Sequence, residues 1–272
     1  MNPGEQYVHG YSPREAQRLE DQAASVKELI HHDTVYPEGS RVLEVACGVG
    51  AQSVTIASRN PGSRFFSFDV AIDSLQAAAA RVRRAGLSNT RMFAADLFTL
   101  PLAAESFADV FVSYLLEHLP DPVAALQTLA GIMRPGGTIT VVEGDHGSCY
   151  FFPRHDAALR AWNCLIEVQA RLGGDSLIGR SLFPLLERAG FVDVTVSPRM
   201  VYADYSRPTM MDLFVAKTIV PMVEGVERQA LEWGLITRRE WEEGLAHLRS
   251  IATSRDGAFC YTFFKAVARK PG

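Results

Sequence analysis

A short apolar segment that runs into a glycine turn constrains the fold of this chain more than any other feature. Residues 42–53 read Val-Leu-Glu-Val-Ala-Cys-Gly-Val-Gly-Ala-Gln-Ser, which predicts a strand, a Gly-x-Gly turn and the start of a helix. A dinucleotide site has a third glycine three residues after the second, where this chain has Ser53, and no Lys or Arg lies between Val42 and Ser58. Glu44 stands just before the turn. The segment therefore predicts an α/β fold whose turn favours a cation over a pyrophosphate.

Carboxylates also follow two further predicted strands. The apolar run 64–69 ends at Asp69, and the strand-like segment 90–96 ends at Asp96. Ligands of open α/β sheets bind beyond the carboxyl ends of the strands, and an acid about 20 residues after the glycines contacts ribose hydroxyls. These acids predict a nucleoside site at one edge of the sheet.

The rest of the pattern alternates between strands and helices. A helix is predicted over about 12–32, another begins at Ile72 and stops at Gly86, and Asp121-Pro122 is predicted to cap the next one. Such alternation produces a parallel sheet with helices on both faces. The predicted fold class is α/β.

In their order and spacing these segments resemble the class I S-adenosylmethionine-dependent methyltransferases. The matching segments are Glu44–Gly50, Asp69, Ala95–Leu97, Val112–His118 and Met133–Gly137, within about residues 40–145. The resemblance implies a Rossmann-like, seven-stranded, mostly parallel sheet, which an antiparallel pair at 191–197 and 259–267 closes. It also implies S-adenosyl-L-methionine as cofactor and S-adenosyl-L-homocysteine as product.

The resemblance further implies the contacts of the cofactor. The glycine turn passes under the methionine portion, Asp69 takes the ribose diol, and Asp96 with Leu97 borders the adenine. The predicted cofactor-binding residues are Tyr11, Glu44, Gly48, Gly50, Gln52, Asp69, Asp96, Leu97 and Tyr114.

Three parts of the chain are expected. Residues 1–39 form an N-terminal cap segment and helix, 40–145 the cofactor-binding core, and 146–272 the remainder of the sheet. Helical insertions at about 146–178 and 205–256 are expected to form a lid over the carboxyl edge. No internal repeat or low-complexity linker separates an independent second domain.

The composition of the chain argues against nucleic acid and a membrane as partners. With 272 residues, 47% hydrophobic content and a net charge of −4, the chain has a sizeable core and no Lys/Arg run suited to nucleic acid. The absence of a basic, apolar start and of any ~20-residue apolar run predicts a cytoplasmic protein without a membrane span. The four cysteines have no metal-ligand spacing, so no metal is expected; three of them would suit an arsenite acceptor, but no vicinal pair supports that. A homo-oligomer is left open.

Methyl transfer from a sulfonium is an in-line displacement that needs alignment, and a base only when the acceptor must lose a proton. The predicted catalytic residues follow the fourth and fifth strands: Glu143, His118, Asp145 and His146. A histidine has a suitable pKa for a base, and carboxylates could instead hold a protonated amine. A packing role for His118 and a structural hydrogen bond for Glu143 remain open.

Aromatic residues dominate the predicted substrate contacts, because aromatic faces suit cations and flat rings. The predicted substrate residues are Tyr7, His9, Glu117, Tyr150, Trp162, Arg180 and Tyr202. The N-terminal aromatic residues are expected to close the site. Core packing remains open for the other aromatics, and Arg180, Arg199 and Lys217 would favour a carboxylate acceptor.

The sequence therefore predicts an enzyme, a methyltransferase that acts on a small molecule, with N-methylation of a ring-containing amine favoured. O- or C-methylation of a phenol, carboxylate or activated carbon is the alternative. From other classes, an NAD-dependent oxidoreductase and a non-catalytic S-adenosylmethionine sensor remain open.

Overall fold

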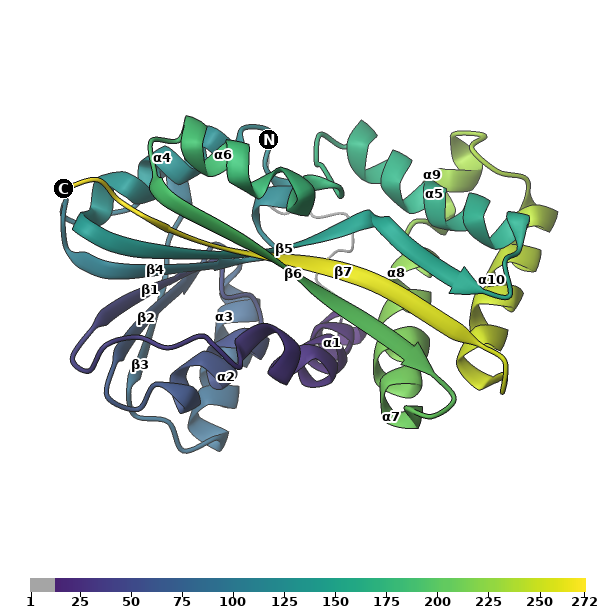
Figure 1. Cartoon of the computed structure of the whole chain (residues 1–272), viewed down its shortest axis with the longest axis horizontal. Coiled ribbons are helices and arrows are strands. Elements are labelled where there is room, and N and C mark those ends of the chain that lie inside the picture. The colour runs from purple at the N-terminus through teal and green to yellow at the C-terminus, as the bar shows by residue number, and fades with distance from the viewer. Residues whose placement is uncertain (1–12) are drawn as a thin grey trace. The chain divides into compact units, whose positions relative to one another are not determined.

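A computed structural model describes residues 13–272, so the predictions for Tyr7, His9 and Tyr11 lie outside the described residues. Within residues 13–272, seven strands form one sheet in the order β3-β2-β1-β4-β5-β7-β6 (Figure 1). The strands are β1 Arg41–Val45, β2 Arg64–Asp69, β3 Thr90–Ala94, β4 Phe107–Ser113, β5 Met133–Phe152, β6 Val192–Asp204 and β7 Ala258–Arg269.

The direction of the strands matches the expected sheet. Strands β1 to β5 pair in parallel with one another, so their carboxyl ends share one edge. Strand β7 runs antiparallel to β5, because Lys270 exchanges backbone hydrogen bonds with Gly136 and Gly137 while Thr262 bonds to the later Ser148. The mostly parallel, seven-stranded sheet with an antiparallel closing pair is confirmed.

The chain folds into two compact units. The sheet-core unit comprises Ile30–Gly144, Ile178–Arg199 and Phe263–Gly272. The helical unit comprises Asp145–Leu177, Met200–Thr262 and the described residues up to Leu29. Strands β5, β6 and β7 each contribute residues to both units.

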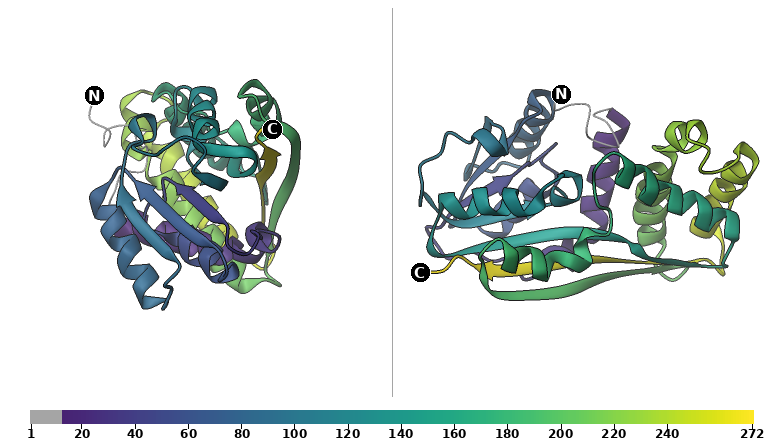
Figure 2. Two further views of the ribbon diagram at one scale, coloured as in Figure 1. Left: turned by 90° about the vertical axis from the view of Figure 1, so that its left-hand side faces the viewer. Right: turned by 90° about the horizontal axis from the view of Figure 1, so that it is seen from above.

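Helices cover both faces of the sheet in the sheet-core unit. Helices α2 and α3 lie on one face, and α4 and α6 on the other (Figures 1 and 2). Their bounds are α2 Ala51–Arg59, α3 Ile72–Arg84, α4 Pro122–Ile132 and α6 Leu182–Arg188. Leu126 and Leu182 pack with Val110 in the core beneath α4 and α6. Helix α4 begins as predicted, with the Asp121 side chain accepting from Ala124 N at 2.9 Å.

The helical unit has its own aromatic core. Its helical segments are most of α1 (Pro13–His31), α5 Asp156–Arg171, α7 Pro208–Met210, a π-helical segment Met211–Ile219, α8 Val220–Glu224, α9 Glu227–Glu232 and α10 Arg238–Thr253. Trp162 of α5 packs edge-on against Phe259 and Tyr261 of β7. The predicted helical character of these insertions is confirmed, and their role as a lid stays a prediction. In the described part of the chain, no helix is both long and apolar enough to cross a bilayer.

Strand β5 is longer than predicted. Asp145 and His146 were predicted to follow the fifth strand, but β5 continues to Phe152 and includes both residues, so that placement is wrong. Side chains alternate along the extension, with Phe151 buried between exposed Tyr150 and Phe152. Pairing with β7 and burial of one face extend the strand, although Gly144 and Gly147 interrupt the apolar run.

Gly50, between β1 and α2, allows α3 to approach the turn closely. It has φ +75°, and a Cβ there would lie 2.8 Å from Ala78 Cβ. Gly39 has a similar φ of +80° but no atom within 4 Å of such a Cβ. Gly50→Ala should therefore lower the free energy of unfolding by about 1–3 kcal/mol more than Gly39→Ala, because only Gly50→Ala adds overpacking to backbone strain. Urea unfolding measures both, and equal losses would contradict the close packing.

Candidate active site

The glycine turn after β1 is fixed to the end of β2. Ala46 and Gly48 both have φ +51°, and Cys47 N donates to Phe68 O at 2.9 Å. Gly48 N donates to Asp69 Oδ2 at 2.7 Å. A Cβ added to Gly48 would meet no atom within 4 Å, so the backbone there faces open space. A ligand can therefore approach this backbone closely.

Asp69 joins the ends of three strands. Besides Gly48 N it accepts from Ala71 N at 2.8 Å, and its carbonyl oxygen accepts from Ala95 N at 3.1 Å, just after β3. Burial raises the pKa of Asp69, while backbone hydrogen bonds from Ala71, Gly48 and Val70 lower it. The side chain thus lies where the turn after β1, the end of β2 and the start of the segment after β3 meet.

Exposed apolar side chains flank this carboxylate and that of Asp96. Asp96 Oδ1 accepts from Phe98 N at 2.8 Å and caps a 3₁₀ turn, Leu97–Thr99, in which Leu97 is buried. Val70, Ile72 and Phe98 are 45%, 60% and 52% exposed. Apolar surface beside a few convergent polar groups is the composition of a small-molecule site. It suits a flat base joined to a hydroxylated sugar.

Glu44 is a buried acid within β1. Its Oε2 accepts from Ser67 Oγ at 2.6 Å on the neighbouring strand. Burial raises the pKa of Glu44 to about 7, the Ser67 hydrogen bond acts against that rise, and the charge of Asp69 adds to it. A positively charged ligand at the turn would favour the ionised form.

Glu143, predicted as catalytic, holds the segment after β4. Its fully buried carboxyl accepts at Oε1 from Leu115 N at 3.0 Å and Leu116 N at 2.8 Å. Burial and the nearby charge of Glu117 raise its pKa well above the ordinary value, against the backbone donors. The geometry gives Glu143 the structural hydrogen bonds that the sequence left open. A contact with the acceptor stays a prediction.

Three predicted residues lie on this held segment. His118 Nε2 is 3.6 Å from Glu117 Oε1, and both side chains are largely buried. Tyr114 has φ +53°, donates its N–H to Val142 O and packs its ring 5.6 Å from that of Phe263. A non-glycine residue at positive φ beside a candidate site is typical of functional segments.

The basic residues proposed for a carboxylate acceptor differ in position. A Cβ on Gly179 would lie 2.7 Å from Gly144 O, so the 3₁₀ turn Ile178–Ser181 packs against β5 directly after Glu143. Arg180 is the exposed third residue of this turn. Arg199 is ion-paired with Asp33. Lys217 pairs with Asp212 in the helical unit at 2.6 Å. Of these three, Arg180 is the cation placed beside predicted site residues.

The remaining predicted residues belong to the helical unit: Asp145, His146, Tyr150, Trp162 and Tyr202. His146 Nδ1 lies 2.8 Å from Tyr261 Oη, and its carbonyl oxygen accepts from Trp162 Nε1 at 2.9 Å. Asp145 Oδ1 accepts from Gly147 N at 3.0 Å. Trp162 and His146 are thus buried in the aromatic core, whereas Tyr150 and Tyr202 are exposed. Their contacts with an acceptor stay predictions.

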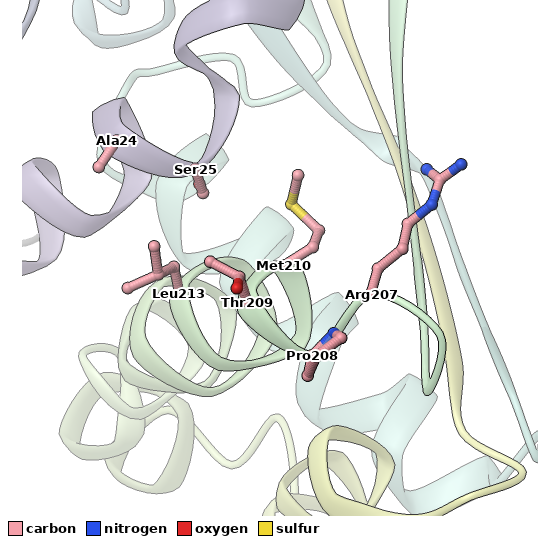
Figure 3. Close-up of a pocket in the computed structure, with 7 residues that line it drawn as sticks. All are labelled: Ala24, Ser25, Arg207, Pro208, Thr209, Met210 and Leu213. Atoms are coloured by element: carbon pink, nitrogen blue, oxygen red, sulfur yellow. The ribbon is translucent and has the colours of Figure 1, made fainter.

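A shallow pocket opens in the helical unit between α1 and the segment 207–213. It is lined by Ala24, Ser25, Arg207, Pro208, Thr209, Met210 and Leu213 (Figure 3). The Arg207 side chain extends away from α1 and donates to Tyr202 O at 3.0 Å. The lining includes none of the predicted site residues, so this pocket gives no support to the predicted acceptor contacts.

Two buried polar residues, His31 and Lys265, were not predicted. His31 Nε2 lies 2.7 Å from Gln52 Oε1, and Lys265 of β7 lies 2.7 Å from Thr34 Oγ1. Lys265 is more than 200 residues from Thr34 in the chain. No local motif could have indicated this contact.

Known proteins match the same part of the chain. Residues 42–137 match a family model described as a methyltransferase domain. The methyltransferase GfsG of Streptomyces halstedii is 29% identical over 50% of this chain and 49% of its own length. Demethylmenaquinone methyltransferase of Geobacillus kaustophilus is 25% identical over 59% of this chain and 74% of its own. The chain thus spans about half the length of the Streptomyces relative.

A solved structure shares the fold over most of the chain. Phosphoethanolamine N-methyltransferase 2 of Haemonchus contortus, in complex with phosphomonomethylethanolamine and S-adenosylhomocysteine, has a TM-score of 0.56 at 14% identity. The alignment covers 93% of this chain and 53% of that one. The matched domain, the sheet order and the glycine turn followed by carboxylates support the resemblance of this chain to the class I S-adenosylmethionine-dependent methyltransferases.

Proposed function

We propose that this protein transfers a methyl group from S-adenosylmethionine to a small-molecule acceptor. The observation that carries the proposal is the arrangement at the ends of β1 to β3, where exposed Val70, Ile72 and Phe98 flank the carboxylates of Asp69 and Asp96. The match of residues 42–137 to a methyltransferase-domain model supports it, as does the binding of S-adenosylhomocysteine by the Haemonchus protein of similar fold. When bound, the cofactor supplies an electrophilic methyl group on a sulfonium.

Different residues bind different parts of S-adenosylmethionine. Asp69 accepts from the ribose hydroxyls, and the apolar side chains beside it hold the adenine. The open backbone at Gly48 admits the amino-acid portion, and the buried Glu44 supplies negative charge toward the cationic end. Because the reaction is a displacement in line with the bond that breaks, holding the two reactants in register supplies most of the catalysis.

We further propose N-methylation of a ring-containing amine, with Glu117 as the residue that holds it. Glu117 follows β4, and its negative charge is one cause of the raised pKa of Glu143. Burial disfavours the ionised form of Glu143, so we assign the attraction of a cationic amine to Glu117. His118, 3.6 Å away, can take a proton from the amine before transfer.

Glu117→Gln tests this acceptor class. For an amine acceptor the substitution should raise KM about 10-fold, the loss expected for one hydrogen bond to a charged group. Steady-state kinetics with varied acceptor measure KM, and Glu38→Gln, on an exposed acid elsewhere in the unit, should change nothing. An unchanged KM would remove Glu117 from amine recognition.

An acceptor without a cationic amine is the second candidate. The likeness to demethylmenaquinone methyltransferase favours an acceptor of the demethylmenaquinone type, and exposed Arg180 could orient an acceptor that carries a negative charge. Under this alternative, Glu117→Gln leaves KM unchanged and label from the methyl group appears in a product without a basic nitrogen.

Ligand binding separates the proposed function from an oxidoreductase. Calorimetry should detect S-adenosylhomocysteine, which NADH should not displace, because the turn lacks the third glycine and nearby cations. Binding of NADH without binding of S-adenosylhomocysteine would overturn the proposal. Binding of S-adenosylmethionine with no transfer to any acceptor would favour a sensor.

A further inference from the structure

A buried lysine begins a chain of hydrogen bonds that ends at the glycine turn. Lys265 is 2% exposed, and its Nζ lies 3.1 Å from Ile30 O, 2.7 Å from Asp33 Oδ1 and 2.7 Å from Thr34 Oγ1. An ammonium group has three protons and no acceptor. All three contacts are therefore donations by Lys265, and one of them fixes the Thr34 hydroxyl as an acceptor.

His31 continues the chain of hydrogen bonds in the same donor-to-acceptor direction. Since Thr34 Oγ1 accepts from Lys265, its own proton is available to His31 Nδ1, 3.2 Å away. An imidazole whose Nδ1 accepts carries its proton on Nε2. His31 Nε2–H therefore donates to Gln52 Oε1 at 2.7 Å. The Gln52 oxygen fixes the same direction, because it can only accept a hydrogen bond and His31 Nε2 must therefore be the donor.

His31 is held in the neutral form that this direction requires. The ring is buried beside Phe111, with ring centroids 5.8 Å apart. Burial lowers the pKa of His31 to about 4, and the positive charges of Lys265 and Arg59 lower it further, against Gln52 and Asp33. Near neutral pH the imidazole is thus a fixed donor rather than a cation.

Gln52 is the second residue of α2 and is half-buried beside the glycine turn. Its oxygen is committed to His31, so the group left for a ligand is the Nε2 amide, which has two protons to donate. We propose that Lys265, Thr34 and His31 orient Gln52 as a donor that recognises the carboxylate of the methionine portion of S-adenosylmethionine. This inference rests on the proposed function. In it, His31 is a positioning residue and Gln52 a specificity-determining one.

Two ligands that differ by one carboxylate test the assignment. By calorimetry, Gln52→Ala should weaken binding of S-adenosylmethionine about 10-fold and leave that of decarboxylated S-adenosylmethionine unchanged. Gln52→Glu, which replaces the donor with a charge, should weaken S-adenosylmethionine more than Gln52→Ala does. Equal losses for both ligands, or no loss for either, would overturn the inference.

A spectroscopic readout tests the positioning role of His31. The ¹⁵N shifts of its ring should report the neutral form protonated at Nε2 around pH 7, and an Nδ1-protonated or charged ring would contradict the chain of bonds. His31→Leu should reproduce the carboxylate-specific loss of Gln52→Ala, and His31→Gln, which can still donate toward Gln52, should restore part of it. If the unaltered protein binds neither ligand, the proposed function fails. If it binds both ligands and the variants keep its relative affinity for S-adenosylmethionine and the decarboxylated form, this inference alone fails.

Discussion

Replacing Asp69 with Asn is expected to weaken binding of S-adenosylhomocysteine about 100-fold or more. Two hydrogen bonds from ribose hydroxyls to a carboxylate contribute about 1.5–3 kcal/mol each, and Asn loses the charge. In the unaltered protein the carboxylate accepts from the backbone N–H groups of Gly48 and Ala71. Asn also places its amide NH₂, itself a donor, against one of these two donors. Asp69→Asn should therefore have the largest effect on cofactor affinity among the predicted contacts.

A second experiment distinguishes loss of the ribose contact in Asp69→Asn from damage to the glycine turn. Adenosine and 2′,3′-dideoxyadenosine form a double-mutant cycle with Asp69→Asn. The unaltered protein should prefer adenosine, and the variant should lose that preference. Asp73→Asn, an exposed acid in the first turn of α3, should keep it. If Asp69→Asn keeps the full preference for adenosine, Asp69 does not bind the ribose.

Glu44→Gln is expected to have opposite effects on stability and on binding. The folded pKa of Glu44 lies near 7, above its ordinary 4.5, so the folded state holds a proton there that the unfolded state has released. Stability is therefore lost as pH rises from about 4.5 to 7, and the charged form costs about 3 kcal/mol above that range. Gln keeps the Ser67 hydrogen bond without the charge. The variant should be more stable than the unaltered protein at pH 8, by urea unfolding.

The affinity for S-adenosylmethionine should fall in Glu44→Gln, whereas the stability should rise. A cationic ligand favours ionised Glu44, so affinity in the unaltered protein should rise as pH increases through about 7. Glu44→Gln should bind about 10- to 100-fold more weakly, with that rise removed. Calorimetry between pH 6 and 8 measures both effects, and Glu38→Gln is the control. A variant that binds as tightly as the unaltered protein would show that the charge of Glu44 does not act on the ligand.

The acids at the sheet edge could be predicted because each signal is local. Strands β1, β2 and β3 are short apolar runs, and Glu44, Asp69 and Asp96 stand at or next to their ends in the sequence. A parallel sheet then brings these ends to one edge without further information. The resemblance to a family supplied the number of strands and the roles of the residues.

The extension of β5 and the contacts of Lys265 could not be predicted in this way. Gly144 and Gly147 end the apolar run that marks a strand, and only pairing with the distant β7 continues it. Lys265 meets Asp33 and Thr34 across more than 200 residues. From the sequence alone, a lysine within a strand is predicted to be exposed to solvent. Glu143 likewise could not be assigned to backbone donors before Leu115 and Leu116 were placed.

Transfer of label from methyl-labelled S-adenosylmethionine tests the central proposal most directly. The purified protein is incubated with the labelled cofactor and a fractionated extract of its source organism, and the label is followed. The proposal predicts label in one small-molecule fraction, in a product that retains a basic nitrogen, and no label with Asp69→Asn. Label in protein or nucleic acid, or no transfer despite measurable cofactor binding, would contradict a small-molecule methyltransferase.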